Sequence, residues 1–189
     1  RRLARPVLDS VKNNFRRTVF SFVPNTAETA FYGMVKGLED ELNLIKGEKI
    51  EGLGKNSTPA KIKKILEMRP RVEKIVVKDA KVRTFIADTT SRGAMVSHVY
   101  DVTYGIVENE KDMLVLMDDS IVRGTTLRHL ARMIREAGAT QIHVRISCPP
   151  IVAPCFYGID FQTETELIAH AKTVEKIREH LGVDSLGYL

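Results

Sequence analysis

The sequence predicts an α/β domain whose central sheet is mainly parallel and is flanked by helices. Apolar strand-like runs alternate with segments of helical periodicity along most of the chain, the pattern of a parallel sheet with crossover helices. The run Met113–Met117 is apolar at every position, as in a strand buried on both faces. With 189 residues and 43% hydrophobic content, the chain is large enough to bury one core as a single domain, residues 1–189.

The first half of the chain contains clear helix and strand signals. Thr58 followed by Pro59 predicts the start of a helix, because Pro is favoured at the first helical position. Asn25, with Glu28 three residues later, is predicted to cap a helix that extends through Lys36. The other predictions for this half are a helix ending near residues 13–14, strands at 18–23, 72–77 and 82–86, and a loop at 47–57.

The second half alternates more regularly. Gly138 and Gly182 are predicted to end helices, since glycine is the usual residue just after a helix. The remaining predictions are strands at 113–117 and 142–146, an ambiguous strand or hairpin at 96–107, a polar loop at 87–93, and helices at 125–137, 164–171 and 174–181.

The most informative segment, DDSIVRGTT, follows the apolar run directly. Open α/β sheets bind their ligands at the carboxyl ends of such strands, and the amino end of the next helix favours phosphate. The pattern therefore predicts a site for a phosphorylated sugar, with the acids binding ribose and a cation. Its predicted ligand-binding residues are Asp118, Asp119, Ser120, Ile121, Val122, Arg123, Gly124, Thr125 and Thr126. A receiver-domain acid pair and a solvated turn are the alternatives, whereas dinucleotide and P-loop glycine motifs are absent from the sequence.

The same segment carries a resemblance to a known family. DDSIVRGTT resembles the signature of type I phosphoribosyltransferases, and the longer stretches DDSIVRGTTLRHLARMIREAGA and CPPIVAPCFYGIDFQTETELIAH resemble the glutamine phosphoribosylpyrophosphate amidotransferase family. The resemblance implies the type I phosphoribosyltransferase fold with a small inserted hood or flap. It also implies transfer of the phosphoribosyl group from phosphoribosyl pyrophosphate to ammonia, giving 5-phosphoribosylamine and pyrophosphate in purine biosynthesis.

Further site residues and partners are implied by this resemblance. Asp118, Asp119 and Arg83 are the implied catalytic residues, and Thr26 joins the two acids as an implied Mg²⁺ ligand. Purine nucleotides are implied inhibitors and a homo-oligomer is expected. An amino-terminal glutaminase domain is implied in a longer protein, although nothing here matches its nucleophilic cysteine. After Arg83-Thr84-Phe85-Ile86 this chain has ADTTSRGAMVSH, with Arg92 as its only firm cation, in place of the several Lys or Arg of the family's lid.

The composition predicts the location of the protein and excludes some classes of partner. Only Cys148 and Cys155 are present; they predict a reducing, cytoplasmic location and no iron–sulfur cluster, which needs about four thiolates. Residues 46–83 hold 12 Lys or Arg against 5 acids, and a lysine-rich insertion is predicted at 38–81. No aromatic residue lies among those lysines, so no nucleic-acid partner is expected, and no membrane span is predicted. Two alternative functions stay open, a nucleobase phosphoribosyltransferase and a non-catalytic nucleotide-sensing module.

Overall fold

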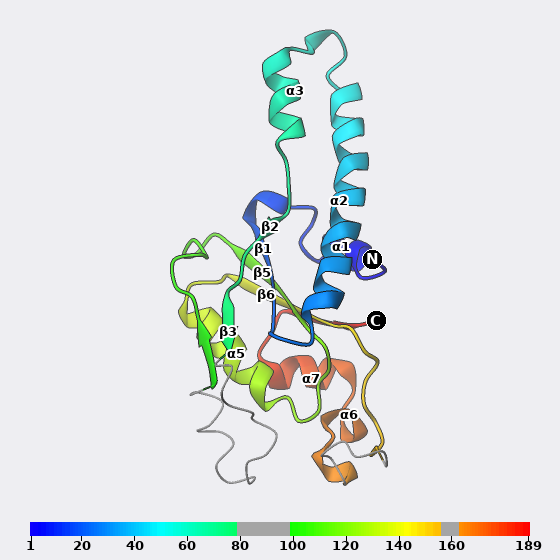
Figure 1. Ribbon diagram of the computed structural model, residues 1–189, viewed down its shortest axis with the longest axis vertical. Coiled ribbons are helices and arrows are strands. Elements are labelled where there is room, and N and C mark those ends of the chain that lie inside the picture. The colour runs from blue at the N-terminus through cyan, green and yellow to red at the C-terminus, as the bar shows by residue number, and fades with distance from the viewer. Residues whose placement is uncertain (79–98, 156–162) are drawn as a thin grey trace.

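A computed structural model describes residues 1–78, 99–155 and 163–189 of the chain (Figure 1). Its centre is a five-stranded sheet in the order β2-β1-β5-β6-β7, and every neighbouring pair in it is parallel. The strands are β1 (Thr18–Phe22), β2 (Arg71–Val72), β5 (Met113–Asp118), β6 (Gln141–Ile146) and β7 (Ser185–Tyr188). A separate antiparallel ribbon consists of β3 (Val76–Lys78) and β4 (Tyr100–Val102).

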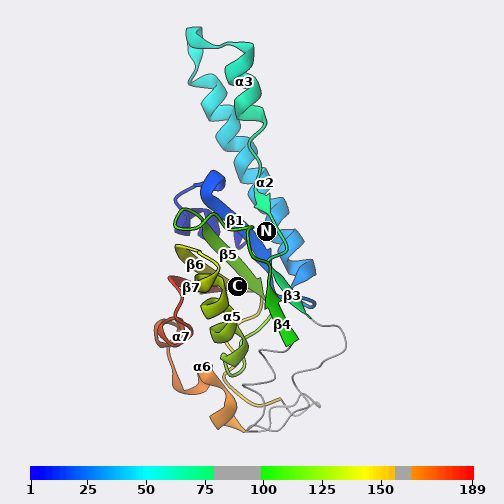
Figure 2. The same ribbon diagram turned by 90° about the vertical axis from the view of Figure 1, so that its left-hand side faces the viewer.

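Helices cover both faces of this sheet (Figure 2). The helices are α1 (Ala4–Ser10), α2 (Glu28–Glu51), α3 (Pro59–Leu66), α5 (Thr125–Glu136), α6 (Ile168–Ala171) and α7 (Val174–Leu181). Short 3-10 turns occur at η1 (Phe15–Arg17), η2 (Gly54–Asn56) and η4 (Glu164–Glu166). The architecture confirms the predicted α/β class with a mainly parallel sheet.

The central strand β5 shows why its sequence is apolar throughout. Val115 and Met117 lie in the core formed with α1 and α2, whereas Leu114 and Leu116 lie in the core formed with α5 and α7. Successive strand side chains point to opposite faces, so a strand covered on both sides needs an apolar residue at every position. The four side chains are at most 1% exposed, as the sequence predicted.

Several predicted helix ends are confirmed. The Thr58 hydroxyl accepts a hydrogen bond from the Lys61 N–H at 3.3 Å, with Pro59 in the first turn of α3. Gly182 ends α7 with a φ of 71°, in the left-handed region that favours glycine. The predicted helix 125–137 is α5, which ends one residue earlier.

Other predictions were wrong. Asn25 does not cap α2: the cap is Ala27, with no side-chain bond, and the Glu28 N–H donates to the Asn25 carbonyl. The predicted strand 72–77 is split between β2 and β3, the predicted helix 164–171 is a 3-10 turn followed by the short α6, and β7 was not predicted. The predicted strand 82–86 and loop 87–93 lie outside the described residues.

The largest difference between the sequence prediction and the structure concerns α2. This helix was predicted to extend through Lys36 but continues to Glu51. Its 24 residues give a length of about 36 Å at about 1.5 Å per residue. The five residues of β1 span only about 17 Å. Because α2 starts beyond the carboxyl end of β1 and runs back along the sheet, its second half extends past the opposite edge. The rest of α2 and all of α3 (residues 43–68, here called the arm) project from the body (Figures 1 and 2).

Candidate functional site

The predicted acidic pair lies at the carboxyl end of the central strand. Asp118 is the last residue of β5 and is 8% exposed. Its Oδ1 accepts the Asp119 N–H at 2.8 Å, and Asp119 Oδ1 in turn accepts the Ser120 N–H at 2.8 Å. The Asp118 and Asp119 carbonyls also accept the N–H groups of Ser147 and Cys148, at 3.0 and 3.1 Å. These bonds fix the pair against the chain that leaves β6.

The electrostatics of the pair distinguish Asp118 from an ordinary surface acid. Burial raises the pKa of the Asp118 carboxyl well above its usual value, and the neighbouring charge of Asp119 raises it further. Two adjacent carboxylates with little solvent repel each other. Such a pair gains stability when a cation or sugar hydroxyls approach it.

The turn after the pair leads into α5, as the phosphate-binding prediction requires. Ile121 is 2% exposed and packs in the core, so only its backbone can face a ligand. Gly124 is the cap of α5 with a φ of 79°. The first N–H groups of a helix have no partner within it, so Thr125 and Thr126 offer both N–H groups and hydroxyls to an anion.

Arg123 and Gly124 also make contacts within the protein itself. The Arg123 guanidinium donates to Glu166 Oε1 at 2.6 Å, and the Ile168 N–H donates to the Val122 carbonyl at 2.8 Å. A Cβ on Gly124 would lie 3.2 Å from Ile168 Cδ1. The turn is therefore fastened to the segment around η4 and α6. The Arg123 guanidinium, which was predicted to contact phosphate, is hydrogen-bonded to the Glu166 carboxylate in this structure.

The loop after β1 lies beside this turn. The Val23 N–H donates to the Met117 carbonyl at 2.8 Å, so β1 and β5 end side by side. Asn25 and Thr26 are both exposed in the loop that follows, and the Pro24–Asn25 peptide bond is cis. Thr26 thus belongs to the same edge of the sheet as the acidic pair. Arg83, the third predicted catalytic residue, lies outside the described residues.

Two residues missed by the sequence reasoning lie near the pair. Tyr100 on β4 is 7% exposed, and Lys78 on β3 places its Nζ 5.5 Å from the centre of the Tyr100 ring. Burial, together with the charges of Asp118 and Asp119, raises the pKa of Tyr100 to about 12. The phenol therefore keeps its proton at neutral pH. The predicted strand 72–77 and the ambiguous alternation at 96–107 were the signals for this ribbon, and neither indicated that the two segments pair.

The carboxylates at this site fit a divalent cation that is bound mainly by the phosphates of a substrate and only partly by the protein. Within the described residues, no group of three His, Cys, Asp or Glu side chains is placed to hold a metal ion. Mg²⁺ commonly keeps several waters and uses one or two carboxylates plus substrate phosphates. Asp118 and Asp119 supply two such carboxylates. The two cysteines are free thiols.

Among the described residues, no helix is both long enough and apolar enough to cross a membrane.

The fold and the site define the class of protein: a type I phosphoribosyltransferase-like α/β domain. A solved structure titled glutamine phosphoribosylpyrophosphate amidotransferase from B. subtilis, complexed with ADP and GMP, matches 91% of this chain with a TM-score of 0.62 and 34% identity. A second, titled the allosteric regulatory enzyme of purine biosynthesis, also matches 91% with a TM-score of 0.56 and 34% identity. This chain covers 31% and 30% of those two chains.

Sequence comparison identifies the same relatives. The amidophosphoribosyltransferase of Bacillus subtilis (strain 168) is 56% identical over 85 residues, which is 45% of this chain. That of Methanothermobacter thermautotrophicus is 61% identical over 82 residues, or 43% of this chain. The chain spans only 17% of the length of each of these relatives, and no family model matches it. In both sequence and fold, the chain is similar to part of the amidophosphoribosyltransferases, as the sequence predicted.

Proposed function

We propose that this domain binds phosphoribosyl pyrophosphate at the carboxyl edge of its sheet and transfers the phosphoribosyl group to ammonia. The bond between the anomeric carbon and pyrophosphate breaks, a carbon–nitrogen bond to ammonia forms, and the proton lost by nitrogen passes to solvent or pyrophosphate. The products are 5-phosphoribosylamine and pyrophosphate. The observation that carries the proposal is the half-enclosed Asp118–Asp119 pair directly before the turn into α5. The solved relative described as the allosteric regulatory enzyme of purine biosynthesis supports that pathway as its setting.

Each part of the site has a distinct task in this reaction. The N–H groups at the start of α5, with the hydroxyls of Thr125 and Thr126, hold the 5′-phosphate. Asp118 and Asp119 accept hydrogen bonds from the ribose hydroxyls. With Thr26 they would hold Mg²⁺, which would supply positive charge to offset that of the pyrophosphate. Positioning and electrostatic stabilisation are the main demands of such a displacement. Arg83 is a further proposed catalytic residue.

The proposal extends to partners and setting. In a longer protein, an amino-terminal glutaminase domain would supply the ammonia. We also propose a homo-oligomeric, cytoplasmic protein, with purine nucleotides competing for the phosphate turn. The solved B. subtilis relative, which is complexed with ADP and GMP, supports nucleotide regulation. The relatives' names do not favour the nucleobase or sensor alternatives.

Calorimetry with the 189-residue chain tests the binding step. We expect phosphoribosyl pyrophosphate to bind in the presence of Mg²⁺ and AMP to compete with it. Asp119→Asn should cost on the order of 1.5–3 kcal/mol of this binding, the value of a hydrogen bond to a charged group. Weak binding of inorganic phosphate should survive, because phosphate does not reach the ribose side. Asp40→Asn on α2 removes a surface carboxylate elsewhere and serves as the control.

The catalytic step is tested by release of pyrophosphate from phosphoribosyl pyrophosphate and ammonium. Release that depends on ammonium supports the proposal, whereas release that depends on an added purine base supports the salvage alternative. Tight binding without any turnover indicates a sensor. If Asp119→Asn abolished phosphate and phosphoribosyl pyrophosphate binding equally in a folded protein, the pair would be structural instead.

A further inference from the structure

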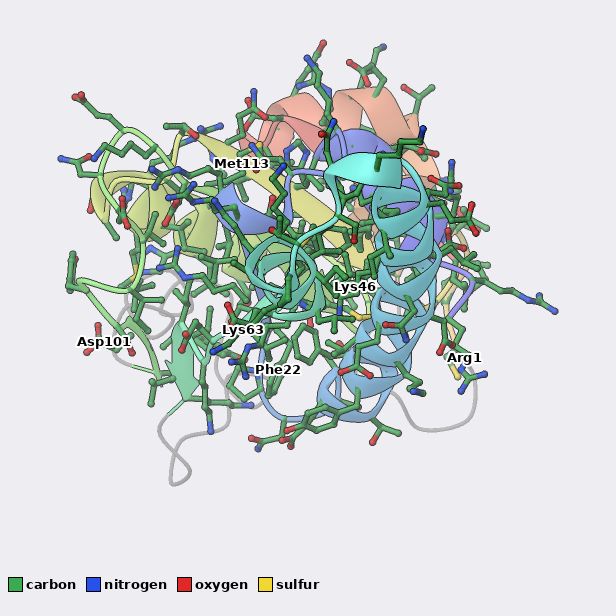
Figure 3. The ribbon with its side chains drawn as sticks, turned by 90° about the horizontal axis from the view of Figure 1, so that it is seen from above. Arg1, Phe22, Lys46, Lys63, Asp101 and Met113 are labelled. Carbon is green, nitrogen blue, oxygen red and sulfur yellow. The ribbon has the colours of Figure 1, made fainter. Side chains whose placement is uncertain are left out.

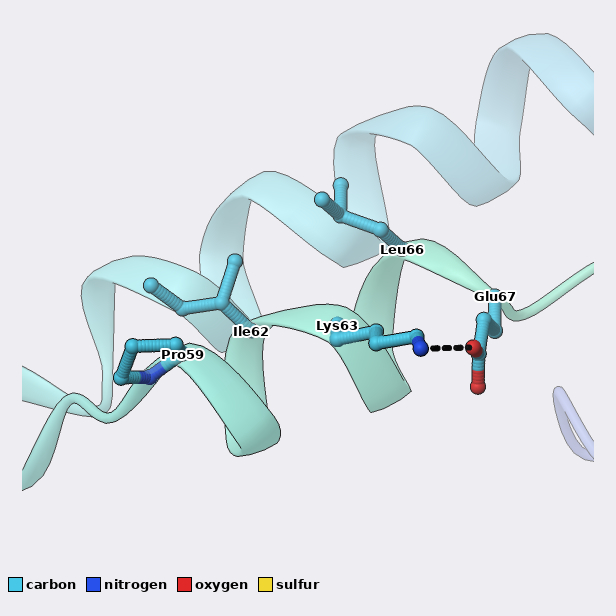
Figure 4. Close-up of a pocket in the computed structure, with 5 residues that line it drawn as sticks. All are labelled: Pro59, Ile62, Lys63, Leu66 and Glu67. Carbon is cyan, nitrogen blue, oxygen red and sulfur yellow. Dashed lines mark ion pairs between the residues drawn. The ribbon is translucent and has the colours of Figure 1, made fainter.

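The arm carries a surface that the proposed reaction does not use. An open groove of about 540 Å³ lies along α3 and is lined by Pro59, Ile62, Lys63, Leu66 and Glu67 (Figure 4). Leu66 is 57% exposed. Pro59, Ile62 and Leu66 lie three and four residues apart, so they form one apolar stripe on the helix. The groove therefore presents apolar side chains on the projecting part of the molecule.

The arm around this groove carries a net positive charge, with six lysines against three acids over residues 43–68. Residues 52–66 contain four lysines (Lys55, Lys61, Lys63 and Lys64) and no acidic residue. Glu67, the acid at the end of the groove, lies 3.9 Å from the Lys63 Nζ (Figure 4). Viewed onto the end of the arm, Lys46 on α2 and Lys63 on α3 are both displayed (Figure 3). An apolar groove in a positive field suits a ligand with an apolar stripe and negative flanks.

We propose that the arm binds an acidic amphipathic helix of a partner protein, with its apolar residues on Ile62 and Leu66 and its carboxylates drawn to Lys63 beside the groove and to the net positive charge of the arm. Helices commonly bind in apolar grooves through residues spaced three and four apart. A second copy of the arm would bring two surfaces of net positive charge together, so charge disfavours self-association. Nucleic acid offers no apolar stripe, and residues 33–78 contain no aromatic residue on which bases could stack. A membrane-binding helix typically inserts a broad apolar face with aromatic residues, which α3 also lacks.

The arm is distant from the reaction site along the strand direction. The acidic pair lies at the carboxyl end of β5, whereas β2, which follows α3, pairs with β1 from its amino-terminal side, Val19 with Arg71. The arm projects from that opposite edge (Figure 1). A helix bound there leaves the phosphate turn open. The inference thus goes beyond the proposed reaction and does not depend on it.

The test uses fluorescence anisotropy of a stapled helical peptide of about 15 residues, a length at which unaided helices are marginal in water. The acidic probe carries leucines three and four residues apart and glutamates elsewhere. Its matched control replaces every glutamate by lysine. We expect the whole 189-residue chain to bind the acidic peptide but not the basic one. Affinity should fall severalfold between ~50 and ~300 mM salt as the charges are screened.

Three variants locate the binding surface. Lys63→Glu should weaken the acidic peptide about tenfold, consistent with losing one favourable charge contact and gaining a repulsive one. Leu66→Glu should abolish binding, with the fold checked by circular dichroism. Lys176→Glu makes an equal charge change on α7, which lies on the body away from the arm (Figure 1). It should leave affinity within about twofold, because salt screens charges that are far apart.

Several results would overturn the proposal. These are no binding of the acidic peptide, equal binding of the basic one, or equal loss with Lys176→Glu. Binding of duplex DNA or of anionic vesicles, lost on Leu66→Glu, would assign the arm to those partners if the peptide did not bind. Concentration-dependent dimerisation in sedimentation that Leu66→Glu removes would assign it to a second copy. Loss of phosphoribosyl pyrophosphate binding affects only the proposed reaction, so the two failures are distinguishable.

Discussion

Gly124 provides a sharp test of how the phosphate turn is held. Its φ is 79°, and a Cβ at this position would lie 3.2 Å from Ile168 Cδ1 and 3.3 Å from Leu181 Cδ2. Gly124→Ala therefore introduces two separate penalties. One is the left-handed backbone conformation, and the other is crowding against α6 and α7.

Both penalties have known magnitudes. A left-handed conformation costs an L-residue roughly 1–2 kcal/mol. Overpacking typically costs about 1–3 kcal/mol, and here the lower part of that range applies because the contacting atoms are ends of flexible side chains. The sum is on the order of 2–4 kcal/mol. For a domain of this size each kcal/mol lowers Tm by about 2–4 °C, so we expect a fall of roughly 4–16 °C.

Differential scanning calorimetry measures the fall, and two further variants separate its causes. Gly105 has a φ of 82°, and a Cβ added there would meet nothing within 4 Å, so Gly105→Ala carries the backbone penalty alone. Ile168→Val removes the Cδ1 that crowds residue 124. It should therefore recover part of the loss in a Gly124→Ala background. If Gly124→Ala cost no more than Gly105→Ala, the reasoning that the turn packs tightly on α6 and α7 would be refuted.

Two further predictions concern titratable groups. Burial acts to raise the pKa of Asp112, but the Glu108 N–H and the guanidiniums of Arg71 and Arg17 lower it below its usual value. Its stabilisation is therefore present above the unfolded pKa of about 4 and is lost as pH falls through the folded value. Arg71→Gln, which removes a 2.5 Å bond to Asp112, should lower the unfolding free energy by on the order of 2 kcal/mol at pH 7; urea titrations should show this difference shrinking in acid, and a difference independent of pH would contradict it. Burial, with the charges of Asp119 and Asp118, raises the pKa of Cys148, so its alkylation by iodoacetamide, followed by mass spectrometry, should be slower at pH 7 than that of a free thiol; an equal rate would count against it.

The parts of the molecule predicted from sequence are those encoded by contiguous residues. β5, the acidic pair, the turn and α5 follow one another without interruption, so an apolar run, a polar turn and a helix start can be read directly. Helix ends at Thr58 and Gly182 were predicted for the same reason, since each cap needs only its immediate neighbours.

The parts that sequence did not predict depend on distant pairing. Tyr100 reaches the acidic pair because β4 pairs with β3, Lys78 opposite Tyr100, and nothing local specifies that register. β7 is only four residues long and only partly buried, and it forms a strand at the edge of the sheet because it pairs with β6. The Asn25–Glu28 pattern predicted that α2 would be capped by Asn25, but the helix is capped two residues later, at Ala27. The path of the loop after β1 therefore determined where the helix begins, and the local capping pattern did not.

The length of α2 connects the site with the arm. Phe31, Met34, Leu38 and Leu42 are buried at helical spacing and fix its first half on the sheet. The turn that begins this half holds Thr26, so the packed part of α2 positions one wall of the site. Beyond Leu42 no α2 residue is buried. Past Ile45, which still packs against this core, α2 can contact a bound helix without displacing the side chains that hold its first part on the sheet. A rigid support for the site and an unburied arm are thus joined in one continuous helix.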